Sequence, residues 1–184
     1  MSESEIISLC QRNDRKAQKD LYANYYGQMM GLCLRYAKNK EQATDMLQKG
    51  FLKVFQAIFD YENSSGFPEW IKNVFVQYVV QYLKSNRQEY YITTTIKAEE
   101  ALSGADLFHQ FTEGDPNNLN DEKYVSALQQ LPPSFRSVFN MYVIDGYSHK
   151  QISEYLEISE ETSKQNLEKA RFSLLRHVQL QNNG

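Results

Sequence analysis

Apolar residues recur at helical spacing along most of the chain, and this pattern limits the fold more than any other feature. The clearest case runs from about residue 41 to 59, where apolar side chains fall on a single stripe of a helix. The stripe consists of Ala43, Met46, Leu47, Gly50, Phe51, Val54, Phe55 and Ile58. Strand-type alternation of useful length is absent from the sequence, so we expect an all-α fold.

An acidic segment separates two helical regions. Six acids and one lysine fall within residues 89–119, and helical periodicity fades there, so we expect a flexible linker between two small domains. Residues 1–88 and 120–184 would form these domains. Helices are predicted at about 4–38 (two helices), 41–59, 68–87, 121–131, 133–144, 148–156 and 159–178.

The composition sets limits on location and partners. A net charge of -3 gives no overall basic signature, so a nucleic-acid surface would have to be a local patch. Two cysteines, Cys10 and Cys33, are too few for a disulfide framework, which fits a reducing cytoplasm. No segment approaches the roughly 20 apolar residues that span a bilayer, so we expect a cytoplasmic protein without membrane insertion.

The segment from Ser148 onward has the layout of a helix-turn-helix. Ser148 and Gln151 form a predicted capping box, and Ser159 is a predicted N-cap followed by two acids in the first turn. A short helix, a turn of about three residues and a longer helix is the arrangement in which the second helix enters the DNA major groove. A plain structural hairpin would show the same pattern.

Two stretches resemble bacterial extracytoplasmic-function (ECF) sigma factors, which are RNA polymerase sigma factors of the sigma-70 family. The C-terminal domain of that family is similar to ALQQLPPSFRSVFNMYVIDGYSHKQISEYLEISEETSKQNLEKAR. Its first conserved domain is similar to KAQKDLYANYYGQMMGLCLRYAKNKEQATDMLQKGFLKVFQAI followed by FPEWIKNVFVQYVVQYLKS. The resemblance implies a region 2-like domain at 1–88, an acidic linker at 89–119 and a region 4-like helix-turn-helix domain at 120–184.

What the resemblance implies is a sigma factor that binds core RNA polymerase and directs promoter-specific transcription initiation. The C-terminal domain would read the minus-thirty-five element as duplex, and the N-terminal domain would melt the minus-ten element. Glutamine and asparagine can pair with adenine edges, while lysine and arginine suit phosphates or guanine. The implied minus-thirty-five contacts are Thr162, Lys164, Gln165, Asn166, Lys169 and Arg171 in the recognition helix, and Arg136 after the two prolines.

Two further surfaces follow from the same resemblance. The loop from Tyr61 to Phe67 matches the segment that captures a flipped minus-ten base, although an ordinary surface turn is an equal alternative. The residues implied to contact minus-ten DNA come from this loop and from the helix after it, namely Tyr61, Asn63, Ser64, Phe67 and Lys72. The implied polymerase contacts are Asp45, Gln48, Lys49, Leu52 and Lys53. The acidic linker matches a segment that threads toward the RNA exit path, or is simply solvated.

Several positions depart from the family pattern. Lys49 stands where an acid is usual, and Glu157 stands where the turn often has glycine. Positions of the recognition helix that are often basic hold Asn166, Glu168, Phe172 and Ser173. Because each lost phosphate contact removes a counterion-release contribution, we expect weak intrinsic promoter recognition. The polymerase or a separate DNA-targeting partner, even an RNA-guided one, would then place the protein, and an anti-sigma factor is a further implied partner.

Other classes of function remain open or are disfavoured. A sigma-like adaptor that binds protein without initiating transcription is one alternative, and a regulator using only its C-terminal helix-turn-helix is another. An enzyme is not expected, because His109, His149 and His177 are scattered and no nucleophile, phosphate-loop or metal-ligand pattern occurs. We therefore expect no catalytic residue, cofactor or metal.

Overall fold

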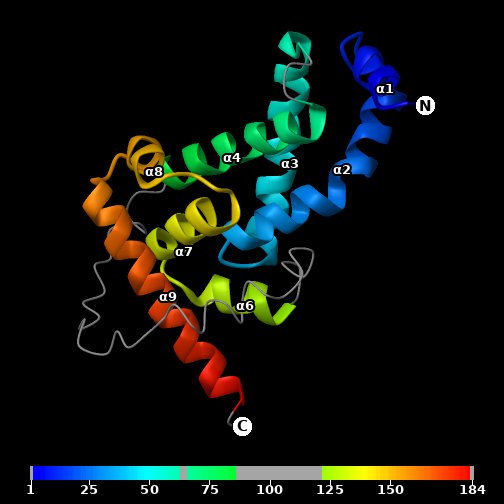
Figure 1. Cartoon of the computed structure of the whole chain (residues 1–184). Coiled ribbons are helices and arrows are strands. Elements are labelled where there is room, and N and C mark those ends of the chain that lie inside the picture. The colour runs from blue at the N-terminus through cyan, green and yellow to red at the C-terminus, as the bar shows by residue number, and fades with distance from the viewer. Residues whose placement is uncertain (1, 63–65, 86–121, 183–184) are drawn as a thin grey trace. The chain divides into compact units, whose positions relative to one another are not determined.

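The computed structural model describes residues 2–62, 66–85 and 122–182, and within these ranges every regular element is helical (Figure 1). The expected all-α class is confirmed. The chain falls into two compact units, residues 1–82 and 83–184. The domain boundaries expected near 88 and 119, and the acidic linker between them, lie outside the described residues and stay predictions.

Local capping explains where the helices of the first unit begin. This unit contains α1 (Glu3–Cys10), α2 (Arg15–Tyr36), α3 (Lys40–Ala57), the 3₁₀ turn η1 (Ile58–Asp60) and nearly all of α4 (Phe67–Ser85). The hydroxyl of Ser2 and the side chain of Glu5 form a capping box, so α1 begins one residue before the predicted start. Asp14 and Asn39 cap α2 and α3 through their side-chain oxygens.

The predicted stripe of α3 supplies much of the first core. All of its members are buried except Phe55, which is half-buried. Gly50 allows a close approach, because a Cβ atom at this position would overlap the ring of Phe75 on α4. Phe75 is fully buried and also contacts the ring of Phe51 edge-on at 5.2 Å. The glycine is therefore what lets an aromatic ring lie directly against α3.

The second unit is built around one long helix. It contains α6 (Glu122–Gln130), α7 (Pro133–Phe139), the π-helical turn η5 (Asn140–Ile144), α8 (His149–Leu156) and α9 (Glu160–Asn182). α9 packs against α6, α7 and α8, and Figure 1 shows it as the long orange-to-red helix. The sequence predicted one regular helix through residue 144 and an end of the last helix near 178. The structure instead has a π-helical turn and continues α9 to Asn182.

The joint between α8 and α9 has the predicted helix-turn-helix layout. The capping box of Ser148 and Gln151 is present, and the hydroxyl of Ser159 accepts a hydrogen bond of 3.0 Å from the backbone N–H of Thr162. Three residues connect the helices, and the first of them, Glu157, adopts the left-handed conformation with φ 55° and ψ 44°. Left-handed backbone favours glycine, so Glu157 occupies a strained position.

Candidate nucleic-acid interface

The outward face of α9 carries most of the residues predicted to read duplex DNA. Lys164 and Gln165 are exposed. The other predicted contacts on this helix are half-buried, namely Thr162, Asn166, Lys169 and Arg171. Three apolar residues form the opposite, buried face, namely Leu167, Ala170 and Leu174. The helix is thus amphipathic, with its polar groups gathered on the side away from the core.

Two side chains of α9 that were predicted to contact DNA are paired with acidic side chains of the same helix. The amide Nε2 of Gln165 donates to Oε1 of Glu161 at 3.2 Å, and Nη1 of Arg171 lies 3.0 Å from Oε1 of Glu168. Lys169 is engaged differently, with its Nζ atom 5.8 Å from the centroid of the Phe135 ring. The polar face of α9 is therefore partly paired with itself.

The predicted phosphate contact at Arg136 is corrected by the structure. Only 3% of the residue is exposed, and its Nη1 atom donates to the backbone carbonyl of Gln129 at 3.3 Å. The guanidinium therefore joins α7 to the end of α6. A cation buried this deeply cannot reach a phosphate on the surface while it keeps this contact. The pattern of prolines followed by arginine gave no information about the direction of the side chain.

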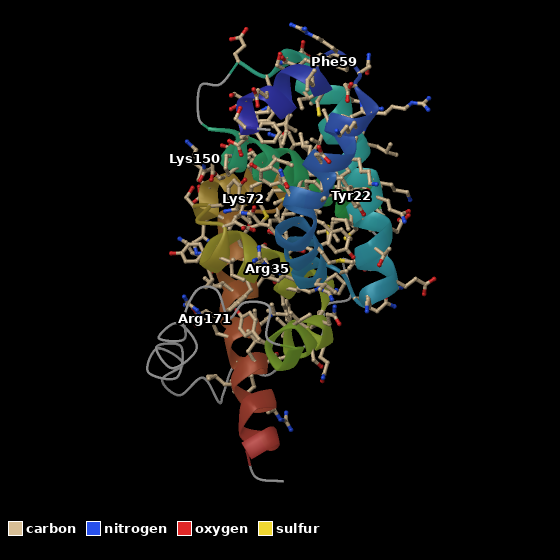
Figure 2. All side chains as sticks on the ribbon, turned by 90° about the vertical axis from the view of Figure 1, so that its right-hand side faces the viewer. Tyr22, Arg35, Phe59, Lys72, Lys150 and Arg171 are labelled. Atoms are coloured by element: carbon tan, nitrogen blue, oxygen red, sulfur yellow. The ribbon has the colours of Figure 1, made fainter. Side chains whose placement is uncertain are left out.

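Lys150 is an exposed cation that the sequence reasoning did not include. It is the second residue of α8, and in a helix-turn-helix the first helix crosses the DNA backbone. Figure 2 shows Lys150 and Arg171 at the outer edge of α8 and α9. Its position just after the cap at Ser148 is the signal that could have identified it.

A polar contact between His149 and Ser163 ties the two helices of the motif together. Nδ1 of His149 lies 2.9 Å from the hydroxyl of the buried Ser163, and the ring of Tyr142 stacks on the imidazole at 4.3 Å. Burial, followed by the charges of Lys164 and Arg171, lowers the pKa of His149 below its ordinary value. The motif therefore favours a neutral imidazole.

In the first unit, aromatic rings gather where the predicted base-capturing loop begins and ends. The ring of Tyr61 packs against Phe67 at 5.2 Å and against Trp70 at 5.0 Å. Phe67 is only 2% exposed, so the prediction that it contacts DNA is wrong: its ring lies beneath Tyr61 and Trp70 and beside Tyr25. Tyr61 is half-buried and keeps part of its surface outside.

The remaining predicted loop residues are only partly described. Asn63 and Ser64 lie outside the described residues, and Lys72 is half-buried on α4. Trp70 packs the end of the loop against the core through its contacts with Phe67 and Tyr61.

The five residues predicted to contact a polymerase occupy one stretch of α3. Gln48, Lys49 and Lys53 are exposed, and 60% of Leu52 is exposed as well. Asp45 is half-buried, and its carboxylate lies 2.8 Å from Nζ of Lys49. The hydrogen bond to Asp45 raises the pKa of Lys49. The positive charge of Lys49 therefore balances the negative charge of Asp45 on this face.

Among residues 2–62, 66–85 and 122–182 no three histidine, cysteine or acidic side chains gather as metal ligands would. Burial raises the pKa of the thiols of Cys10 and Cys33 to about 11 and about 12. No helix in the same ranges has the length and apolar character needed to cross a membrane.

Comparison with known proteins gives matches for both units. The family described as "Sigma-70 region 2" matches residues 21–89, and the family described as "Sigma-70, region 4" matches residues 121–174. RNA polymerase sigma-H factor of Pseudomonas aeruginosa is 21% identical, with 96% of this chain and 94% of the relative covered. ECF RNA polymerase sigma factor SigW of Bacillus subtilis is 23% identical, with 94% of each chain covered. ECF RNA polymerase sigma-E factor of Escherichia coli K12 is 22% identical, with 97% and 95% covered.

Proposed function

Because this chain belongs to the sigma-70 family, we propose that it is an ECF-type sigma factor that binds core RNA polymerase in the cytoplasm and directs promoter-specific initiation. The observation that carries the proposal is the order of the two family matches. The region 2 match, residues 21–89, covers most of the first helical unit and continues a few residues past it, and the region 4 match lies within the second unit. The chemistry of transcription belongs to the polymerase, so this chain would contribute binding and positioning alone.

In the second unit, α9 would contact the minus-thirty-five element. Of the predicted contacts, Lys164 and Gln165 are exposed, and Thr162, Asn166, Lys169 and Arg171 are half-buried. The amides of Gln165 and Asn166 suit adenine edges, and the cations suit phosphates or guanine. Arg136 is not part of this proposal, because it is buried.

The first unit would supply the minus-ten and polymerase contacts. Tyr61, with the predicted partners Asn63, Ser64 and Lys72, would hold a base that has left the stack, and an aromatic ring can return part of the cost of flipping. The exposed Leu52 would be the apolar centre of the polymerase contact. Around it would lie the polar residues Asp45, Gln48, Lys49 and Lys53.

We further propose that promoter recognition by α9 is weak. The ion pair of Glu168 with Arg171 joins an exposed carboxylate to a half-buried guanidinium, and a pair with this much solvent access contributes only about 0.2–1 kcal/mol, so DNA can displace it. The carboxylate nevertheless stays near the phosphates after displacement and repels them. A separate DNA-targeting partner would then help to place the holoenzyme. The pairs of Glu161 with Gln165 and Glu168 with Arg171 support this part of the proposal.

Run-off transcription with purified core polymerase tests both parts. We expect the chain to bind core and to give only weak transcripts from a two-element promoter unless lysate from its native cell is added. Leu52→Glu is the control. Because Leu52 is exposed, the substitution should leave the hydrophobic core of the first unit undisturbed, and it should abolish binding to core RNA polymerase. Strong initiation with core alone would contradict the partner requirement but not the sigma activity.

Two other outcomes separate the alternatives. Binding to core without permanganate-reactive promoter thymines, even with lysate present, would favour an adaptor that does not initiate transcription. A chain that fails to bind core at all would contradict the proposed function as a whole.

A further inference from the structure

Gln11 lies at the joint between α1 and α2 and contacts the start of the loop fifty residues away. Its Nε2 atom donates to the backbone carbonyl of Ile58 at 3.0 Å and reaches that of Tyr61 at 3.4 Å. These two carbonyls stand at the beginning of η1 and immediately after it. One amide group therefore holds both ends of the turn that leads into the loop.

The backbone of Gln11 is itself fixed, which makes the side chain a defined support. Its N–H bonds the carbonyl of Ile7 at 2.9 Å and caps the end of α1. The following turn is closed by the hydrogen bond from the N–H of Asp14 to the carbonyl of Leu9, at 3.0 Å. α1 is anchored by the buried residues Ile6 and Cys10.

A second connection joins α1 to the far end of the same loop. The hydroxyl of Tyr25 donates to the carboxylate of Glu3, and the ring of Tyr25 meets that of Phe67 edge-on at 5.5 Å. Phe67 is the first residue of α4 and packs against the ring of Tyr61. The backbone of Tyr61 is thus held through Gln11, and its ring is held through Phe67 and Trp70.

We propose that Gln11 is a positioning residue for capture of the minus-ten base. Both of its contacts are to backbone carbonyls, so it fixes where Tyr61 stands rather than touching DNA itself. This inference rests on the proposed sigma activity and assigns a role to a residue that precedes the region 2 match, which begins at residue 21.

The test uses the full chain bound to core polymerase and a library of random single-stranded DNA about 12 nucleotides long, within the range of known single-strand sites. Gln11→Met keeps the length of the side chain and removes the donor. The control is Gln28→Met, an exposed glutamine of α2. Base preference, affinity for core and thermal unfolding are measured for the unmodified chain and both variants.

We expect the unmodified holoenzyme to enrich one base strongly, and Gln11→Met to lower that preference about tenfold, as the loss of two neutral hydrogen bonds would. Core affinity should stay unchanged, and the chain should stay folded at the assay temperature with a melting temperature lower by only several degrees, as the loss of two hydrogen bonds implies. Gln28→Met should behave like the unmodified chain. An unchanged preference in Gln11→Met would overturn the inference and leave the proposed function standing. A parallel loss of core affinity or of folding would also overturn it. If the unmodified holoenzyme enriches no base, the proposed minus-ten function itself fails, and the inference with it.

Discussion

The two surfaces assigned to DNA are held in place by different forces. In the first unit, Tyr61 is fixed by packing on Phe67 and Trp70 and by a neutral hydrogen bond to its backbone. On α9, the polar face is arranged by exposed pairs such as Glu168 with Arg171. Packing in a core is costly to disturb, whereas exposed ion pairs are weak and screened by salt. Tyr61 is therefore firmly held, whereas the polar face of α9 is easily rearranged.

The largest expected effect tests the rigid side of this comparison. In Gly50→Ala the new Cβ would overlap the buried ring of Phe75, so the first unit should lose about 1–3 kcal/mol of stability. Denaturant unfolding followed by fluorescence of Trp70, the single tryptophan, reports on this unit.

Gly27→Ala provides the matched control for that substitution. Nothing lies within 4 Å of a Cβ atom at this position of α2, so the same change should stabilise the helix by about 0.5–1 kcal/mol. A similar loss of stability in both variants would show that the loss in Gly50→Ala does not come from overlap with Phe75.

The second prediction concerns the polar face of α9. Glu168→Gln removes the ion pair with Arg171 and one negative charge, so affinity for duplex DNA should rise about tenfold, the equivalent of about 1.4 kcal/mol. The slope of log affinity against log salt should steepen by about one unit if Arg171 gains a phosphate. Fluorescence anisotropy with a labelled duplex measures both quantities.

Glu41→Gln is the charge-matched control, because this exposed acid lies on α3 in the other unit. It changes the net charge by the same amount and should leave the salt slope unaltered. Equal gains in both variants would mean that overall charge, and not the pair with Arg171, limits DNA binding.

The third prediction concerns the turn between α8 and α9. Glu157→Gly removes the strain of a left-handed glutamate and should stabilise the second unit by about 0.5–1 kcal/mol after the entropic cost of glycine. Hydrogen exchange of the amides in α8 and α9 measures the change. Glu154→Gly makes the same substitution inside α8 and should instead destabilise by about 1 kcal/mol. Similar losses at both positions would contradict the strain at Glu157.

Sequence reasoning succeeded where structure depends on near neighbours. The caps at Ser148 and Ser159 and the buried stripe of α3 follow from spacings within a few residues. It failed where a side chain is placed by distant parts of the chain. Nothing near Phe67 or Arg136 in the sequence indicates that tertiary packing buries them. Gln11 was missed for the same reason, since its partners lie about fifty residues away.

The smallest expected effect is the pH dependence of the second unit. The pKa of His149 is lowered by burial and by Lys164 and Arg171, against the weaker opposing influence of Glu160 and Glu168. The unfolded chain therefore binds a proton more readily than the folded one, so stability is full above the ordinary pKa of 6.5 and falls as the pH drops through it.

His149→Asn can keep a hydrogen bond to Ser163 but cannot titrate, so it should remove this part of the pH dependence. Urea unfolding followed by circular dichroism at about pH 7.5 and about pH 5.5 compares the two proteins. Carboxylates titrate in both, so the relevant quantity is the difference between them. We expect the unmodified chain to lose more stability on acidification, and only slightly more, because the imidazole is partly open to solvent. A greater loss in His149→Asn would mean that the charged imidazole is the form that the pairing of α8 with α9 stabilises.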